Sequence, residues 1–152
     1  MTNPPINSNL IETYFKAIEL GDSDSVREIL EKERNLTKIK RRGEYQYDTS
    51  IELDAYKFLG AYLGAVSGLQ LALLLGYDSI ARDIADITFD QDLNMIFGDN
   101  NTTLHLAAFL ENKEMVQSLL ERGADANAKN GKGFTPLDVS NDSQVSKLLS
   151  KN

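Results

Sequence analysis

The chain has 152 residues, of which 41% are hydrophobic and 26% charged, and its net charge is −7. Such a composition is ordinary for a single globular domain with its own core, and it excludes extensive disorder. The acidic balance argues against a general nucleic-acid binder, because phosphate groups are repelled by a negative surface. The absence of cysteine excludes disulfide bonds and thiolate metal sites.

The start of the chain has no basic region followed by an apolar run, so no secretory signal is predicted and a cytoplasmic or nuclear location is expected. One uncharged stretch, Phe58 to Tyr77, is long enough to cross a bilayer. Four glycines interrupt this stretch, and it lacks clear aromatic and basic flanks. We therefore expect buried repeat helices here rather than a membrane span.

The first predicted element is a helix pair within residues 10–34. Ala17-Ile18-Glu19-Leu20-Gly21 belongs to one helix and Asp24 to Leu30 to the next. The corresponding alanine of the second pair is Ala72, which lies 55 positions after Ala17, whereas the later units repeat every 33. About 22 residues are therefore inserted, and the predicted insertion is 35–65.

Within the insertion we expect a loop from Lys38 to Ser50 and an extra helix from Ile51 to Val66. The loop contains a short basic run, which we interpret as solvated: Lys38, Lys40, Arg41 and Arg42. Gly60 and Gly64 would lie on one face of the extra helix and allow close packing. The alternative is that these glycines break the helix.

The remaining chain divides into three units. In the unit at 66–98, a helix pair is predicted from Ala72 to Ala85. In the unit at 99–131, Thr102-Thr103-Leu104-His105 opens a first helix, and an apolar stripe marks the second, formed by Met115, Val116, Leu119 and Leu120. The opening recurs 33 residues later as Thr135-Pro136-Leu137-Asp138, in a shortened unit at 132–150 that we interpret as a C-terminal cap.

The unit at 99–131 resembles the ankyrin repeat. It combines the Thr-Thr-Leu-His opening with paired alanines at 107 and 108, a second helix ending in two leucines, and Gly123-Ala124-Asp125-Ala126-Asn127. Weaker resemblance extends over about 10–34 and the rest of 66–150. It implies an all-α fold, an ankyrin-repeat solenoid of about four stacked helix pairs in a single domain, 1–152, with the loop and extra helix inserted between repeats one and two. Stacking would give the pairs the continuous core that one pair alone cannot form.

No enzyme chemistry, cofactor or metal is predicted. His105 is the only histidine, and no nucleophile or orienting acid is marked beside it in the sequence. In the ankyrin pattern this histidine is structural. The run from Asp90 to Asn94 imitates the start of a calcium loop, but Met95 stands where glycine is required and Asn101 where a glutamate is required.

The ankyrin pattern also implies where a partner binds. The two residues after the paired first-helix alanines point into the concave groove of that pattern, and here five of these six are apolar. A solvent-facing row of this kind marks an interaction site. The loops between repeats, which we call fingers, add a large aromatic and a basic residue. The predicted partner-binding residues are Leu20, Leu74, Leu75, Phe97, Phe109, Leu110 and Lys129.

We therefore expect a protein–protein interaction module, either an adaptor or a regulatory scaffold, that holds a segment of another protein in an apolar groove. The chain is expected to be monomeric by itself, with neither nucleic acid nor membrane as a partner. The alternative is a purely structural repeat module or spacer, in which the insertion fills the groove.

Overall fold

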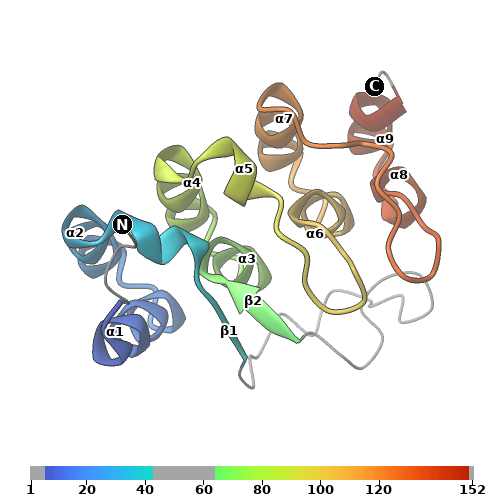
Figure 1. The fold of residues 1–152 in the computed structure, drawn as a ribbon. Coiled ribbons are helices and arrows are strands. Elements are labelled where there is room, and N and C mark those ends of the chain that lie inside the picture. The colour runs from blue at the N-terminus through green and yellow to red at the C-terminus, as the bar shows by residue number, and fades with distance from the viewer. Residues whose placement is uncertain (1–5, 43–63, 151–152) are drawn as a thin grey trace.

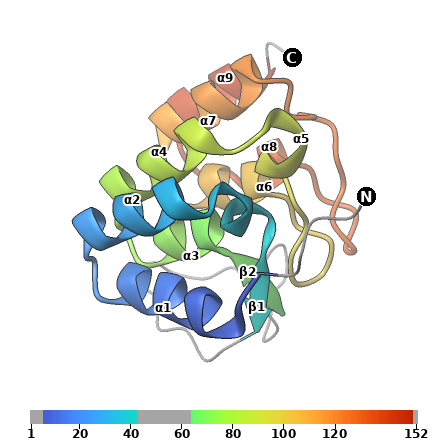
Figure 2. The same ribbon diagram turned by 60° about the vertical axis from the view of Figure 1, so that its left-hand side comes forward.

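The computed structural model describes residues 6–42 and 64–150, and within them the helices form two layers. Figures 1 and 2 show helix pairs following one another across the molecule, with the first helix of each pair in one layer and the second helix in the other. The pairs are α1 (Ser8–Glu19) with α2 (Ser23–Lys32), α3 (Gly68–Leu74) with α4 (Asp78–Ile87), α6 (Thr103–Phe109) with α7 (Lys113–Glu121), and α8 (Pro136–Val139) with α9 (Ser143–Ser150). The expectation of a mostly helical chain is confirmed.

Three of the first helices begin in the same way, with a capping box. The side-chain oxygen of Ser67 accepts from the backbone N–H of Gln70, and the Gln70 side chain accepts in return from the N–H of Ser67. Thr102 with His105, and Thr135 with Asp138, repeat this arrangement at α6 and α8. Each box satisfies two N–H groups that a helix start leaves without partners.

Three first helices also end in the same way. After α1, the N–H of Gly21 donates to Ile18 and that of Asp22 to Ala17, which is the Schellman pattern of a helix C-terminus. The same two bonds follow α3 and α6. The pattern requires a left-handed residue, and Gly21 and Gly76 supply it with φ of 70° and 79°. Gly123 ends α7 in the same conformation, as the sequence predicts.

One hydrophobic core runs between the two layers. The first helices contribute large side chains that are completely buried, such as Phe15, Leu71 and Leu106. Each second helix buries one apolar stripe, which in α7 consists of Met115, Val116 and Leu119, with Leu120 at its edge. The predicted stripe of this helix is thus confirmed.

The fold is not strictly all-α, because β1 (Lys40–Arg42) and β2 (Ala65–Ser67) pair as antiparallel strands, with Arg41 opposite Val66. The prediction of a loop from 38 to 50 is wrong at β1. The predicted extra helix is wrong at its C-terminal end, where Gly64 has a φ of 68° and residues 65–66 are extended in β2. The rest of that predicted helix, 51–63, lies outside the described residues.

Two short helices complete the described part, η1 (Arg34–Lys38) and α5 (Asp90–Leu93). They flank the C-terminus of α4, where two arginines donate to backbone carbonyl groups of the last helical turn. Arg34 donates to the carbonyl of Ile87 at 2.7 Å, and Arg122 donates to that of Ala85 at 2.6 Å. No helix among residues 6–42 and 64–150 is long and apolar enough to span a membrane.

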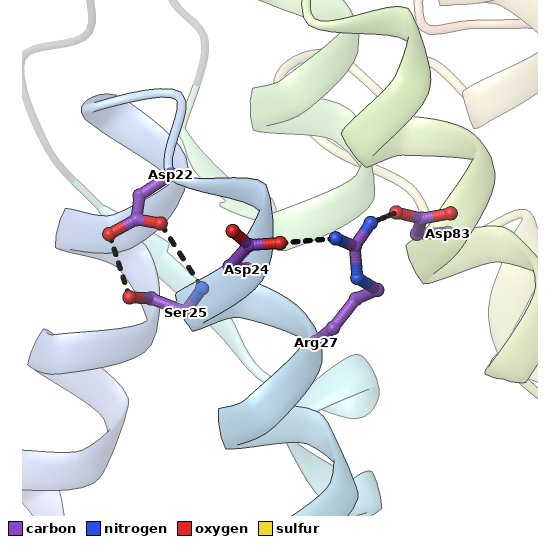
Figure 3. Close-up of polar contacts among 5 residues, drawn as sticks. All are labelled: Asp22, Asp24, Ser25, Arg27 and Asp83. Atoms are coloured by element: carbon purple, nitrogen blue, oxygen red, sulfur yellow. Dashed lines mark hydrogen bonds and ion pairs between the residues drawn. The ribbon is translucent and has the colours of Figure 1, made fainter.

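Polar side chains link neighbouring second helices on the outer face (Figure 3). Arg27 on α2 pairs with Asp24 on its own helix and reaches Asp83 on α4 at 3.0 Å, and these contacts raise its pKa. Asp22 caps α2 by accepting from the N–H and the hydroxyl of Ser25, and these hydrogen bonds lower the pKa of its carboxyl group. Because these side chains are exposed, we expect the pairs to align the helices more than to stabilise them.

A close contact between α1 and α3 fixes the first two pairs against each other. The fully buried ring of Tyr14 lies on the backbone of Gly68, the first residue of α3. A methyl group at Gly68 would lie only 2.6 Å from the ring carbon that bears the Tyr14 hydroxyl. Among the described residues, that hydroxyl has no hydrogen-bond partner.

We predict that Gly68→Ala lowers the free energy of unfolding by about 1–3 kcal/mol, because the buried ring has no room to move away. Tyr14→Phe removes an unpartnered hydroxyl and should cost little by itself. Combined with Gly68→Ala, it should reduce the loss below the sum of the single variants. Urea denaturation of the four proteins measures this coupling. Additive effects would contradict the proposed packing.

Candidate protein-binding surface

The row of side chains predicted to face solvent on the concave side is exposed only in part, and two of its apolar members are buried. Phe109 is only 5% exposed, and Leu74 is buried as well. The expectation that these residues are exposed is therefore wrong. Both lie in the last turn of a first helix that packs against first helices on both sides, and both belong to the continuous core.

The fingers differ from the expectation in a similar way. Phe97 is buried and pairs through its backbone with Asn101, closing a narrow finger in which Gly98 and Asn100 adopt left-handed conformations. Its neighbour Ile96 is the exposed apolar residue of this finger. Lys129, in the next finger, is exposed as expected, and its contact with a partner stays a prediction.

Apolar side chains instead reach solvent at the turns between the helices of a pair. Leu20 is 68% exposed and Tyr77 is 36% exposed, and the Tyr77 ring lies over Gly21 of the preceding turn. Leu75 and Leu110 are half-buried at the following positions of this row. We call this surface the turn edge, and it consists of residues 20–22, 75–78 and 110–113.

A groove of about 540 Å³ lies on the turn edge between the α3–α4 and α6–α7 turns. Leu74, Leu75 and Leu110 form its apolar part. Polar pairs bridge its sides, because Asn112 donates to Asp78 at 3.4 Å and Arg82 lies 3.4 Å from Glu114. The groove therefore combines leucine side chains with a charged rim.

Two residues of the turn edge break the local rules that their neighbours follow. Glu111 adopts a φ of 60° at the position that Gly21 and Gly76 occupy in the other pairs. A side chain in this conformation costs about 1–2 kcal/mol. Tyr77 stands before α4 at the capping position of Asp22 and Asn112, and it makes no side-chain cap. Both departures can be recognised in the sequence. When the repeats are aligned, Glu111 replaces a glycine and Tyr77 replaces a capping residue.

His105 is a structural residue. Its Nδ1 accepts from the N–H of Thr102 at 3.1 Å, so the proton of the neutral ring is on Nε2, which donates to the carbonyl of Phe134 at 2.8 Å. Burial lowers the pKa of this ring, and the Phe134 carbonyl and the Asp138 carboxylate oppose that shift. A neutral imidazole with both nitrogens engaged is not available as a catalytic base.

The described residues contain no group of three or more His, Asp or Glu side chains that could hold a metal ion. The residues of the run from Asp90 to Asn94, which resembles the start of a calcium loop, have structural roles. Asp90 accepts from Arg122 at 2.8 Å, and Asn94 accepts from the N–H of Leu104 at 2.9 Å. These side chains fix α5 and the start of α6.

Comparison with known proteins identifies the repeat. The ankyrin-repeat family model matches residues 99–131. The chain is an ankyrin-repeat-containing protein. It is similar to the ankyrin repeat-containing protein BDA1 of Arabidopsis thaliana, with 39% identity over 46% of this chain and 16% of that protein. It is also similar to the regulatory protein NPR6 of the same plant, with 29% identity over 67% of this chain and 22% of that protein.

A third similar protein is alpha-latrotoxin-Lg1a of Latrodectus geometricus, with 34% identity over 38% of this chain and 4% of that protein. The chain thus spans less than a quarter of the length of each of these relatives. Ankyrin repeats generally mediate protein–protein interactions, so a protein partner agrees with the family.

We predict that His105→Gln weakens the pH dependence of stability. Since the folded protein holds this ring with a lowered pKa, the unfolded chain binds the proton more readily, and stability falls as the pH drops through about 6.5. Gln70 occupies the same place in the preceding pair without titrating, which makes glutamine the matched replacement. Thermal melts at pH values of about 7.5 and 5.5 should show a smaller loss in the variant. An equal loss in both proteins would contradict the assignment.

A second prediction compares two apolar residues that the sequence places in one row. Phe109→Glu should lower the free energy of unfolding by at least about 3 kcal/mol, because it removes a buried ring and buries a charge. Leu20→Glu should change it by no more than about 0.5 kcal/mol, because water can solvate the new carboxylate. Chemical denaturation of both variants measures the difference. Equal effects would show that the row is uniformly exposed or uniformly buried.

Proposed function

We propose that the chain is a non-enzymatic protein-interaction module, an adaptor or regulatory scaffold in which four ankyrin-type helix pairs form one stack and a partner protein binds the turn edge. Recurrence supports four units, since capping boxes open three first helices and Schellman turns close three. The proposed domain is 1–152, with repeats at about 10–34, 66–98 and 99–131 and a cap at 132–150.

The long connection between repeats one and two fits an insertion into a finger. Between Phe97 and Asn101 the second finger has three residues, and the third finger has three between Asn130 and Phe134. The paired residues at the corresponding place in the first finger are Arg41 and Val66, which are 25 positions apart. We therefore propose that the insertion lies within the first finger, between Arg41 and Val66.

The observation that carries the binding proposal is the strained backbone at Glu111. A glycine is used at this position in two other pairs, and the glutamate is the less stable choice. Residues that break a local rule without a structural gain concentrate at functional sites. Glu111 lies on the rim of the groove whose wall contains Leu75 and Leu110. We infer that its carboxylate binds a cationic group of a partner segment while an apolar side chain of that segment enters the groove.

The alternative, a structural spacer, draws support from the buried Leu74, Phe97 and Phe109. Stability decides the composition of a spacer, so a purely structural role gives no reason for the strained glutamate at 111. It also leaves Leu20 exposed without a role. The two functions therefore differ in what they predict for substitutions at the turn edge.

We predict that Glu111→Gly stabilises the protein by about 1 kcal/mol and weakens partner binding. Peptides selected on the wild-type protein by phage display supply the ligands for the binding measurement. They should lose affinity for Glu111→Gly and for Leu110→Glu.

The matched control is Asn100→Gly, because Asn100 also has a left-handed backbone, with a φ of 58°, but lies in a finger. This variant should keep the affinity of the wild type. Peptides that bind all of these variants with equal affinity would contradict the turn edge as the binding surface and favour the spacer.

A further inference from the structure

A second surface with a distinct chemistry lies at the end of α4 opposite the turn edge. Here residues 34–40 run alongside residues 87–96. Contacts hold the two segments together at both ends, because Arg34 Nε donates to the carbonyl of Ile87 at 2.7 Å and Lys40 Nζ donates to that of Ile96 at 2.9 Å. We call the surface between them the basic–aromatic patch. It consists of Arg34, Lys38, Lys40, Phe89 and Ile96.

The patch exposes two large apolar side chains. Phe89 is 42% exposed and Ile96 is 49% exposed. Two cations lie over the Phe89 ring, with the Arg34 guanidinium carbon 4.2 Å and Lys38 Nζ 5.7 Å from its centre. Both distances are within the range of cation–π attraction. Stacking on Arg34 gives Phe89 a structural role, but it explains neither the second cation nor the exposed isoleucine.

Within residues 6–42 and 64–150, the three cations of the patch have no acidic partner. No described carboxylate forms an ion pair with Arg34, Lys38 or Lys40, although the chain has a net charge of −7. The nearby Asp90 is paired with Arg122 instead. Glu31 and Asp86 share the groove between α2 and α4 with Arg34, but neither pairs with it. Among the described residues, the patch therefore presents three cations that no carboxylate pairs with, on a protein whose net charge is −7.

We propose that the basic–aromatic patch binds an acidic segment of a partner protein. Carboxylates of the segment face Arg34, Lys38 and Lys40, while one of its apolar side chains packs on Phe89 and Ile96. Complementary charge would orient the segment, and burial of the two exposed side chains would contribute affinity. A short peptide fits this surface better than a nucleic acid, since a long phosphate chain would extend onto the acidic remainder of the protein.

The test uses a short fluorescein-labelled peptide in which a leucine–phenylalanine pair is flanked on both sides by glutamates. Its control carries glutamine in place of every glutamate. In fluorescence anisotropy at low salt, the wild type should bind the acidic peptide at least about tenfold more tightly than the control peptide. High salt should reduce this preference.

Lys38→Glu should weaken binding of the acidic peptide by about tenfold, because it reverses the charge beside Phe89. Lys147→Glu is the matched control, since this exposed lysine on α9 undergoes the same change in net charge away from the patch. It should change the affinity by less than about twofold. Phe89→Leu should weaken the binding of both peptides. Thermal melts establish that each variant is folded.

Three outcomes would overturn the proposal. Equal binding of the acidic and control peptides would show that charge is not recognised. Equal losses of affinity for the acidic peptide in Lys38→Glu and Lys147→Glu would show that only the net charge of the protein matters. Binding to phosphatidylserine vesicles that depends on Lys38, without binding of the acidic peptide, would indicate a membrane surface. Glu111→Gly should leave the peptide affinity unchanged, so failure here is distinguishable from failure at the turn edge.

Discussion

The stack depends on one buried polar side chain near the start of α3 and another near the start of α6. Each side chain forms hydrogen bonds both within its own capping box and with residues further along the chain. Gln70 accepts from the N–H of Ser67 in its own capping box and donates to the carbonyl of Met95 at 2.6 Å and to the hydroxyl of Thr103 at 3.1 Å. His105 repeats this arrangement toward Phe134. Both side chains are fully buried, and an unpaired polar group there would be costly. Each unit therefore requires the next one in a defined position.

This coupling determines which surfaces remain for a partner. It holds the first helices against one another, so that their last turns, with Leu74 and Phe109, belong to the core. The turns between the helices of a pair lie outside the packing between first helices. They can therefore carry residues that lower the stability of the fold. Glu111 and Tyr77 are such residues, and they lie near a leucine-lined groove. At these two positions, on the surface that we assign to binding, the residue type departs from what local stability favours.

The sequence predicts the helical units well because their signals are local. Fixed spacing locates the helix pair at 99–131, and Gly123 marks its end. Exposure could not be predicted in the same way, because it depends on packing between units that are distant in the sequence. The buried Phe109 and Phe97 illustrate this limit. The strand at Lys40–Arg42 was missed because it has no apolar alternation and is defined only by pairing with residues 65–67.

The most direct test of this account measures which apolar residues reach solvent. The chain has no cysteine, so single substitutions Leu20→Cys, Leu110→Cys and Phe109→Cys each introduce one reporter thiol. The account predicts that the thiol at 20 reacts with a maleimide as fast as a thiol in the unfolded chain, and the one at 110 somewhat more slowly. The thiol at 109 should react at least about a hundredfold more slowly, because it must wait for local opening. Equal reaction rates at 20 and 109 would contradict the account and return the binding surface to the concave row.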